Sequence, residues 1–332
     1  MITERWLLIE TLGRAEGWSV LAVGTAPRQW KSFHRAVPAR LQPLVVVAHA
    51  NGSVVDQVLP LSRQAWSGRR LRAVPIFGPD ERVYAIHVWV GPGDPPPRPG
   101  VAPLLVDART RSLDALPQCL GPHFDIDRTR WVGAESFEMV ERFDGALDLV
   151  ATITRSEPDS RWLGTATVRS KAGPRSLLVA ARNADTVADR HRWLGLAVDV
   201  TDSIAPQRKS FEATALDMLR RAQPNLYLAI MDTAQIRLIR WVTEPVPALR
   251  WAGVDERTVP HPADRARIIA ARNTMLSGAP HAQLRNVRLA SETNDWIIAD
   301  LEISPLPSST PGSPEFVLAQ LEIVENPGHN NA

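Results

Sequence analysis

Apolar and polar residues alternate most regularly in the last two-thirds of the chain, where one order of elements occurs twice. Residues 161–202 and residues 283–325 each read as two strands joined by a polar turn, then a loop and a final strand. Such short alternating runs are typical of half-buried strands, and fixed-order similarity indicates duplicated domains. The predicted strands are 165–169, 176–181 and 194–200 in the first copy, and 283–289, 296–303 and 316–324 in the second.

The first part of the chain mixes several patterns. Residues 20–23 and 44–49 read as short strands or buried segments, and residues 83–90 form the clearest strand because they combine β-branched and aromatic side chains. A proline-rich run at 91–100 cannot continue a central strand. A strand pattern resumes at 104–107, so we expect this loop to lie inside the domain. The boundary is then predicted near residue 122.

The second segment begins with a pattern of helical spacing. Phe137, Val140, Phe143 and Leu147 recur at intervals of three and four residues. This spacing places apolar side chains on one face of a helix. We therefore expect a helix here, before the three strands of the first copy.

A separate amphipathic helix is predicted between the two copies, over residues 203–222. Ile204, Phe211 and Met218 form a heptad-spaced row, with Leu219 beside it. One hypothesis is that this helix transmits a signal or forms the seam of a homodimer. The other is that it packs on its own domains. Three heptads are too few to indicate a coiled coil.

The third segment opens with apolar runs at 226–231 and 236–242. Pro262 then marks the start of a helix over 263–276, since proline is favoured in a first helical turn. His261, directly before it, is expected to cap the helix or to pair with Asp264. The second copy of the strands follows.

Composition limits the classes of protein that the chain can belong to. With 332 residues, 44% of them hydrophobic and 22% charged, we expect two or three globular domains. The sequence pI is about 9.0, although the formal net charge is only +2. Nearly all of this basicity is arginine, and the densest basic run, Arg69-Arg70-Leu71-Arg72, is interpreted as a solvated strand edge, so we expect no nucleic-acid binding.

Targeting and redox features are sparse. No apolar run approaches the ~20 residues that a membrane-spanning helix needs. Cys119 is the one cysteine of the sequence, which excludes an intramolecular disulfide. We therefore expect a cytoplasmic protein that does not insert into a membrane.

Searches for catalytic and metal-binding patterns give nothing specific. There is no phosphate-binding glycine loop, dinucleotide-binding fingerprint or nucleophile elbow. The eight histidines show no spacing typical of a metal site. We expect neither an enzyme nor a cofactor or metal. Cys119 is interpreted as a small apolar core residue.

Four stretches carry a resemblance to a known family. They are Gln64-Ala65-Trp66-Ser67-Gly68, His87-Val88-Trp89-Val90-Gly91 with its proline-rich loop, residues 193–202, and residues 257–265 around His261-Pro262. In these stretches the whole chain resembles a family of actinobacterial, chiefly mycobacterial, proteins built of tandem sensor domains. In that family a GAF-like domain precedes two PAS-like domains, and no effector domain is attached.

The resemblance implies an α+β fold of three tandem domains, each with an antiparallel sheet flanked by helices. The expected divisions are a GAF-like domain at 1–122, a PAS-like domain at 124–202, a connecting helix at 203–223, a second PAS-like domain at 224–325 and a tail at 326–332.

Tryptophans in strand-like contexts are the candidates for a ligand cavity. Most are expected to be core residues because tryptophan buries a large area, but one or two can line an apolar cavity. His87 lies beside Trp89 and is interpreted mainly as a buried, satisfied histidine. The cavity candidates are Trp66, His87, Trp89, Trp193 and Trp296, and the candidates for signal transmission are Ile204, Phe211, Met218 and Leu219.

Two functional hypotheses follow. The first is a non-catalytic signal-sensing protein that binds a small ligand or a protein partner and is read by an unknown effector protein. The second is a ligand-free scaffold for protein–protein interactions. Whether a cavity is occupied in the purified protein separates the two.

Overall fold

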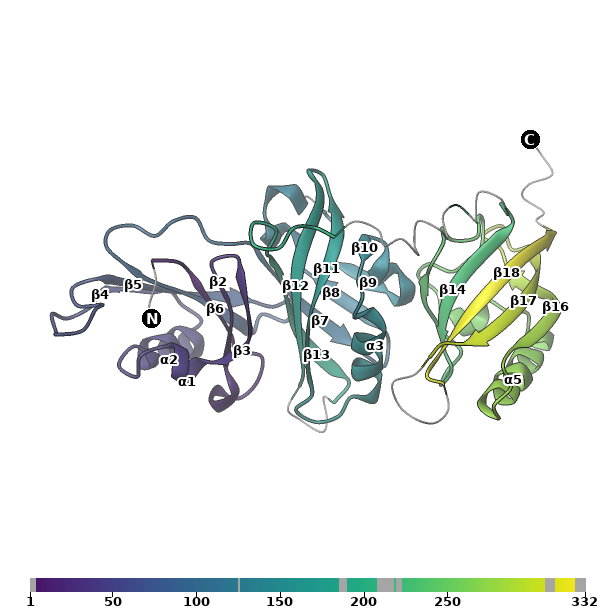
Figure 1. Cartoon of the computed structure of the whole chain (residues 1–332), viewed down its shortest axis with the longest axis horizontal. Helices are drawn as coiled ribbons and strands as arrows, with labels where there is room; N and C mark the ends of the chain where they lie inside the picture. The colour runs from purple at the N-terminus through teal and green to yellow at the C-terminus, as the bar shows by residue number, and fades with distance from the viewer. Residues whose placement is uncertain are drawn as a thin grey trace. The chain divides into compact units, whose positions relative to one another are not determined.

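The computed structural model describes residues 4–124, 126–184, 190–207, 218, 223–307 and 314–325. The chain divides into two compact units. The first consists of residues 1–131 and 139–208, and the second of residues 132–138 and 209–332. The described strands form three antiparallel sheets, two in the first unit and one in the second (Figure 1).

The first sheet has the strand order β3-β2-β1-β6-β5-β4. Its central strand β6, Val83–Gly91, is buried from Tyr84 onwards. A short run of this kind, apolar at nearly every position, is typical of a strand covered on both faces. The other strands are β1 (Leu7–Glu10), β2 (Ser19–Val23), β3 (Ala26–Ser32), β4 (Val55–Val58) and β5 (Arg70–Phe77).

Each face of the first sheet has its own cover. On one face, α1 (Phe33–Ala36) and α2 (Gln42–Asn51) pack Phe33 and Val45 against Ile86. On the other face, Leu8, Leu21 and Ala85 belong to one core with Leu178 and Leu196 of the second sheet. Sheet therefore packs on sheet within the first unit.

The second sheet has the order β10-β11-β12-β13-β7-β8-β9. Its middle is an antiparallel meander of the three strands predicted in the first copy, and α3 (Ala146–Arg155) is attached to it because Trp162 Nε1 donates to Asp148 Oδ2 at 2.7 Å. The strands are β7 (Val101–Asp107), β8 (Ser112–Ala115), β9 (Arg130–Val132), β10 (Val140–Arg142), β11 (Arg161–Ser170), β12 (Gly173–Asn183) and β13 (Arg192–Asp199).

The third sheet, in the second unit, has the order β15-β14-β18-β17-β16. Helix α5, Pro262–Leu276, lies along β16 and contributes Ile268, Ala271 and Met275 to the core of this sheet (Figure 1). The strands are β14 (Leu226–Asp232), β15 (Leu238–Trp241), β16 (Ala282–Ala290), β17 (Trp296–Pro305) and β18 (Phe316–Glu325).

Short 3₁₀ helices fill several connections. One of them, η4, belongs to the second unit although it precedes α3 in the chain, and its Ala134 joins the core of the third sheet. They are η1 (Ala15–Gly17), η2 (Pro117–Leu120), η3 (Pro122–Phe124), η4 (Gly133–Phe137) and η6 (Glu256–Thr258).

The expected α+β fold of three helix-flanked domains is wrong. More of the described residues lie in strands than in helices, and the three sheets carry few helices. The second sheet shows the physical reason, because one of its apolar faces is covered by the first sheet. Leu178 and Leu196 pack there against Leu8 and Leu21.

The proline-rich loop lies within the first compact unit, but the strand after it joins another sheet than expected. It connects β6 of the first sheet to β7, and β7 pairs with β13 from Val101 to Asp107. Residues 101–115, assigned to the N-terminal domain from the sequence, therefore belong to the second sheet. Strand partners far apart in the chain leave no local signal, and this explains the difference.

Two local expectations are also corrected. Residues 44–49 lie in helix α2, where Pro43 occupies the first turn. The helix predicted over 137–147 is absent from the described structure: Phe137 ends η4, Val140 starts β10, and α3 begins only after Gly145. Asp144-Gly145 favours a turn, and this local preference prevails over the apolar spacing. The strands predicted in both copies are confirmed as β11, β12, β13, β16, β17 and β18.

Most of the predicted connecting helix lies outside the described residues, and so do Phe211 and Leu219. Ile204 packs against the core between the first and second sheets, and Met218 is exposed. Near Ile204, Gln207 N donates to Thr167 Oγ1 at 3.1 Å. The start of this segment thus rests on the second sheet.

Candidate functional site

A cavity of about 540 Å³ lies in the second unit, between the third sheet, α5 and the segment that precedes α5. This volume is in the range of pockets that hold small organic ligands. Its lining side chains are mostly apolar, among them Met231, Leu249, Ile268, Leu301 and Ile303. An apolar cavity of this kind favours an apolar occupant over water.

The floor of the cavity owes its depth to two alanines. Ala229 of β14 and Ala319 of β18 are directly paired across the strands, and both are at most 2% exposed. Around them Met231, Val317 and Leu321 line the same space. Because side chains alternate between the faces of a strand, these residues share one face of the sheet. Because the two alanines at the centre of this face have only methyl side chains, the space above them stays empty.

Aromatic and helical residues form the walls. Trp241 and Trp251 meet edge to face, with ring centroids 6.2 Å apart and an interplanar angle of 79°. Opposite the sheet, Ile268 and Met275 of α5 are buried. The indole Nε1 of Trp241 is buried and lacks a hydrogen-bond partner among the described residues. The two tryptophans and α5 therefore enclose the cavity with largely apolar surface.

The mouth of the cavity is marked by lining residues that are exposed. They include Gln235, Asp255, Arg257 and Ile269, of which Ile269 is 48% exposed. Asp255 accepts three contacts from the guanidinium of Arg257, at 2.9, 3.0 and 2.5 Å. This ion pair lowers the pKa of Asp255 to about 2, so the carboxylate stays charged and occupied.

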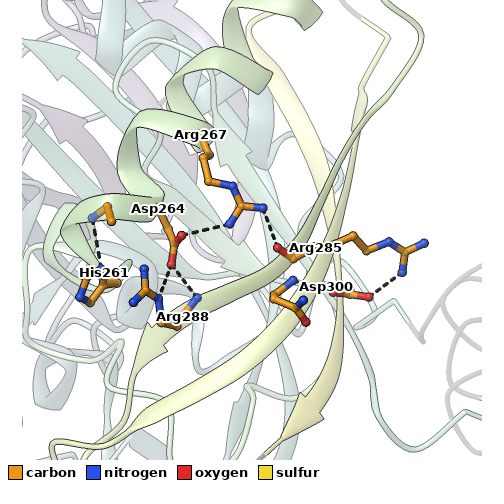
Figure 2. A network of polar contacts seen from close by, with 8 residues as sticks. His261, Asp264, Arg267, Arg285, Arg288 and Asp300 are labelled. Carbon is orange, nitrogen blue, oxygen red and sulfur yellow. Dashed lines mark hydrogen bonds and ion pairs between the residues drawn. The ribbon is translucent and has the colours of Figure 1, made fainter.

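A polar network holds α5 in place beside the sheet (Figure 2). Asp264 Oδ2 accepts from the backbone N–H of Arg288 at 3.1 Å and from its Nε at 2.9 Å, while Oδ1 accepts from Arg267 at 3.0 Å. Arg267 also donates to the carbonyl of Arg285 at 2.6 Å. These contacts lower the pKa of Asp264 to about 2. The network links α5 to β16 and thereby positions one cavity wall.

The first turn of α5 is capped as the sequence suggests. His261 Nδ1 accepts from the backbone N–H of Ala263 at 3.2 Å, and Pro262 occupies the first helical position. Trp296 stands against this cap, with its ring centroid 4.9 Å from that of His261. Trp296 is 38% exposed and does not line the cavity. It covers the helix start instead.

The other predicted cavity residues lie in the first unit, in three separate packed environments. Trp66 belongs to the core under α1 and α2. Trp193 is fully buried in β13, and its Nε1 lies 3.4 Å from Ser156 Oγ. His87 and Trp89 lie on β6 near Trp6, whose ring centroid is 5.7 Å from that of His87. The structure does not bring the five candidates together.

His87 is buried under the start of the proline-rich loop. Trp6 Nε1 donates to the carbonyl of Pro96 at 2.8 Å, which ties that loop to the sheet. Burial, and then the charge of Arg98, lower the pKa of His87 to about 3. Its Nε2 has no hydrogen-bond partner among the described residues. His87 is therefore a neutral core residue, but it is not a satisfied one.

Sequence reasoning missed the residues that line the observed cavity. Trp241, Trp251 and the paired alanines were not singled out. A weak signal was available, because an alanine stands in the middle of each apolar run, at 226–231 and at 316–324. A small residue at the centre of a buried strand leaves space unless a neighbour fills it. Which strands are neighbours could not be read from the chain.

The described residues contain neither a metal-binding cluster nor a membrane-spanning helix. In the part of the chain that the structure describes, no group of three His, Cys, Asp or Glu side chains is placed to hold a metal ion. No described helix has the length and apolar character to cross a membrane. Cys119, interpreted from the sequence as a core residue, is exposed in η2.

Comparisons with known proteins identify a solved structure with the same fold. Residues 5–99 match a family model described as Rv3651-like, N-terminal. The crystal structure of an uncharacterized protein from Mycobacterium tuberculosis is similar over 98% of this chain and 97% of that chain, with a TM-score of 0.74 and 21% identity. At this identity the likeness shows a shared fold. The expected resemblance to a mycobacterial protein is thus confirmed at the level of fold. A comparison with curated proteins gives no match.

Two further structures show weaker similarity. The PAS-B domain of Drosophila melanogaster Cycle matches 29% of this chain and 98% of its own, with 10% identity and a TM-score of 0.26. An RNA-binding light-oxygen-voltage receptor matches 68% of this chain and 96% of its own, with 11% identity and a TM-score of 0.26. TM-scores this low do not show a shared fold. The GAF-like and PAS-like assignments are therefore not confirmed.

Proposed function

We propose that this protein is a non-catalytic sensor that binds a small, largely apolar molecule in the cavity of its second unit. The cavity of about 540 Å³ is the observation that carries the proposal. Its depth comes from Ala229 and Ala319, and its walls from Trp241 and Trp251. Burying an apolar ligand there gains roughly 25 cal/mol per Å² of apolar surface removed from water.

The polar groups of the lining favour binding over catalysis. Asp255 is engaged by Arg257, and Asp232 Oδ1 accepts from the backbone N–H of Gln235 at 2.6 Å. Thr258 Oγ1 donates to the carbonyl of Asp255 at 2.7 Å. None of these groups is arranged as a nucleophile beside its base, the arrangement that covalent catalysis requires.

The proposed output is a change in α5, read by a protein partner. A ligand in the cavity touches Ile268 and Met275 on one side of this helix, while Asp264 anchors it to β16. A ligand shifts a conformational equilibrium only by its difference in affinity for the two states. Contacts between a ligand and this helix wall provide such a difference.

The test is to fill the cavity. Ala319→Leu places a larger side chain at the floor, and Ala270→Leu, on the exposed side of α5, is the matched control. Binding is measured with N-phenyl-1-naphthylamine, a neutral apolar fluorophore. We expect fluorescence enhancement with the wild type and the control and at least about ten-fold weaker binding by Ala319→Leu. Equal binding by all three proteins would contradict the proposal.

Native mass spectrometry of the full chain separates this proposal from the alternative of a ligand-free scaffold. We expect a bound small molecule of defined mass on wild-type protein purified gently from an actinobacterial host, and none on Ala319→Leu. A bare wild-type protein that also fails to bind the fluorophore would favour the scaffold.

A further inference from the structure

Two arginines of the cavity lining are paired with no carboxylate among the described residues. Arg265 is half-buried, and its Nε donates to the carbonyl of Pro260 at 3.1 Å. Arg272 donates to the carbonyls of Thr233 and Ala234. Carbonyl contacts satisfy N–H groups but leave the positive charges unneutralised. Both charges stand on α5, beside apolar side chains.

The lining carboxylates do not balance these charges. Asp255 forms its ion pair with Arg257, so that pair is neutral as a whole. Asp232 accepts from the backbone N–H of Gln235. With Arg257, Arg265 and Arg272 set against Asp232 and Asp255, the ionised side chains of the lining carry a net positive charge. An anion at this site is therefore favoured over a cation.

A carboxylate suits these charges. It accepts hydrogen bonds and has no proton to donate, and charge-assisted hydrogen bonds to such a group are the stronger kind. The two arginines therefore favour a ligand whose polar group is a carboxylate.

From this arrangement we propose that the ligand is an anionic amphiphile, with a carboxylate head near Arg265 and an apolar body over Ala229 and Ala319. This inference rests on the proposed function and names its ligand class. The apolar body accounts for the floor and the tryptophan walls. The head accounts for a half-buried guanidinium that pairs with no carboxylate in the part of the chain that the structure describes.

The test compares three head groups on one alkyl chain: dodecanoate, dodecanol and dodecylammonium. Each is titrated into the full-length protein by calorimetry, below the concentration at which it forms micelles. We expect dodecanoate to bind about ten-fold more tightly than dodecanol, since a charge-assisted contact is gained. Dodecylammonium is expected to bind most weakly because like charges repel.

Substitutions then test whether Arg265 causes the preference for dodecanoate over dodecanol. Arg265→Gln is expected to make dodecanoate and dodecanol bind about equally, while the affinity for dodecanol stays the same. Arg265→Lys keeps the charge and retains part of the preference. Arg250→Gln is the matched control in the same unit, because Arg250 is exposed and does not line the cavity. Thermal unfolding of each variant verifies that it is folded.

The outcomes separate this inference from the proposed function. If the wild type bound dodecanoate and dodecanol equally well, the proposed ligand class would be overturned. If Ala319→Leu then bound neither, the cavity would still be the binding site. A preference for dodecanoate that survives Arg265→Gln would also overturn the ligand class. Failure of all three probes and of N-phenyl-1-naphthylamine would overturn the proposed function itself.

Discussion

Glu10 is the residue whose environment differs most from that of a surface carboxylate. It ends β1 and is fully buried. One oxygen accepts from the backbone N–H of Leu12 at 3.0 Å, and the other has no hydrogen-bond partner among the described residues. Burial raises the pKa of Glu10 to about 7, although Leu12 and Arg182 act in the opposite direction. The desolvation cost therefore exceeds the favourable contacts.

This shift predicts a pH dependence of stability. In the unfolded chain Glu10 loses its proton near pH 4.5, whereas the folded protein keeps it to about pH 7. The folded state thus binds more protons in this window, and stability falls as the pH rises through it. Glu10→Gln is expected to be up to about 3 kcal/mol more stable than the wild type at pH 8, and much closer to it at pH 4.

The measurement is denaturant unfolding of both proteins at several pH values, with the difference between them plotted against pH. His87 titrates over an overlapping range, because its pKa is lowered to about 3. Its neutral folded form loses stability as the pH falls below the ordinary histidine value. That contribution is the same in both proteins and cancels in the difference. A difference that does not vary with pH would contradict the prediction.

At the scale of elements, α5 shows how a helix is held in place. Arg267 is exposed on its outer face, and its buried face contributes Ile268, Ala271 and Met275 to the core. The second attachment is electrostatic, through Asp264, whose side chain is 5% exposed (Figure 2). A buried carboxylate with several donors contributes more than an exposed ion pair does.

Asp264→Asn removes the charge at nearly constant volume. We expect it to lower the free energy of unfolding by about 2 kcal/mol at pH 7, since contacts to Arg288 and Arg267 lose their ionic character. The stability difference between the wild type and this variant should disappear as the pH falls from the pKa of an ordinary Asp towards 2, because folding lowers the pKa of Asp264 to about 2. Denaturant unfolding at pH 7 and at pH 2.5 measures both effects.

Asp300→Asn on β17 serves as the control for this comparison. Asp300 pairs with Arg285, whose side chain is 68% exposed, so solvent screens the interaction. We expect a loss below about 1 kcal/mol. Equal losses in the two variants would show that burial of Asp264 adds nothing to its contacts.

At the scale of the whole molecule, each hydrophobic core draws its residues from one unit. The core that contains Val287, Ile297 and Leu321 lies within the second unit. The cores around Phe33, Leu196 and Phe124 lie within the first. Domains with their own cores can fold as separate cooperative units.

We therefore expect two unfolding transitions in calorimetry at pH 8. Glu10→Gln should raise the midpoint of one transition, and Asp264→Asn should lower the midpoint of the other. Hydrogen exchange with mass spectrometry assigns each transition to its residues. A single transition, shifted by both substitutions, would show that the units unfold together.

The strands were largely predictable because their signals are local. The apolar and β-branched residues at 83–90 form β6, and the hairpins of both copies occur where alternation and polar turns indicate them. The cap at His261 and Pro262 was predictable for the same reason, since it depends only on neighbouring backbone groups. By contrast, residues 44–49 carry a short apolar run that periodicity cannot assign, and they form a helix.

The candidate site was not predictable. The tryptophans that the sequence singled out fill several separate environments, and Trp296 covers the start of a helix. The cavity depends on the pairing of Ala229 with Ala319, and on α5 bringing Arg265 to the same space. A small residue such as alanine gives rise to a cavity only when the strands and helices packed around it do not fill the space beside it.

The sequence by itself determined which segments extend into strands, where α5 begins, and that catalytic and metal-binding patterns are missing from it. These properties follow from the preferences of residues close together in the chain. Only the tertiary structure decided that β7 pairs with β13, that one sheet covers another, and that the lining of one cavity collects positive charge. Each of these depends on contacts between distant segments, whose partners are selected by the packing of the whole core.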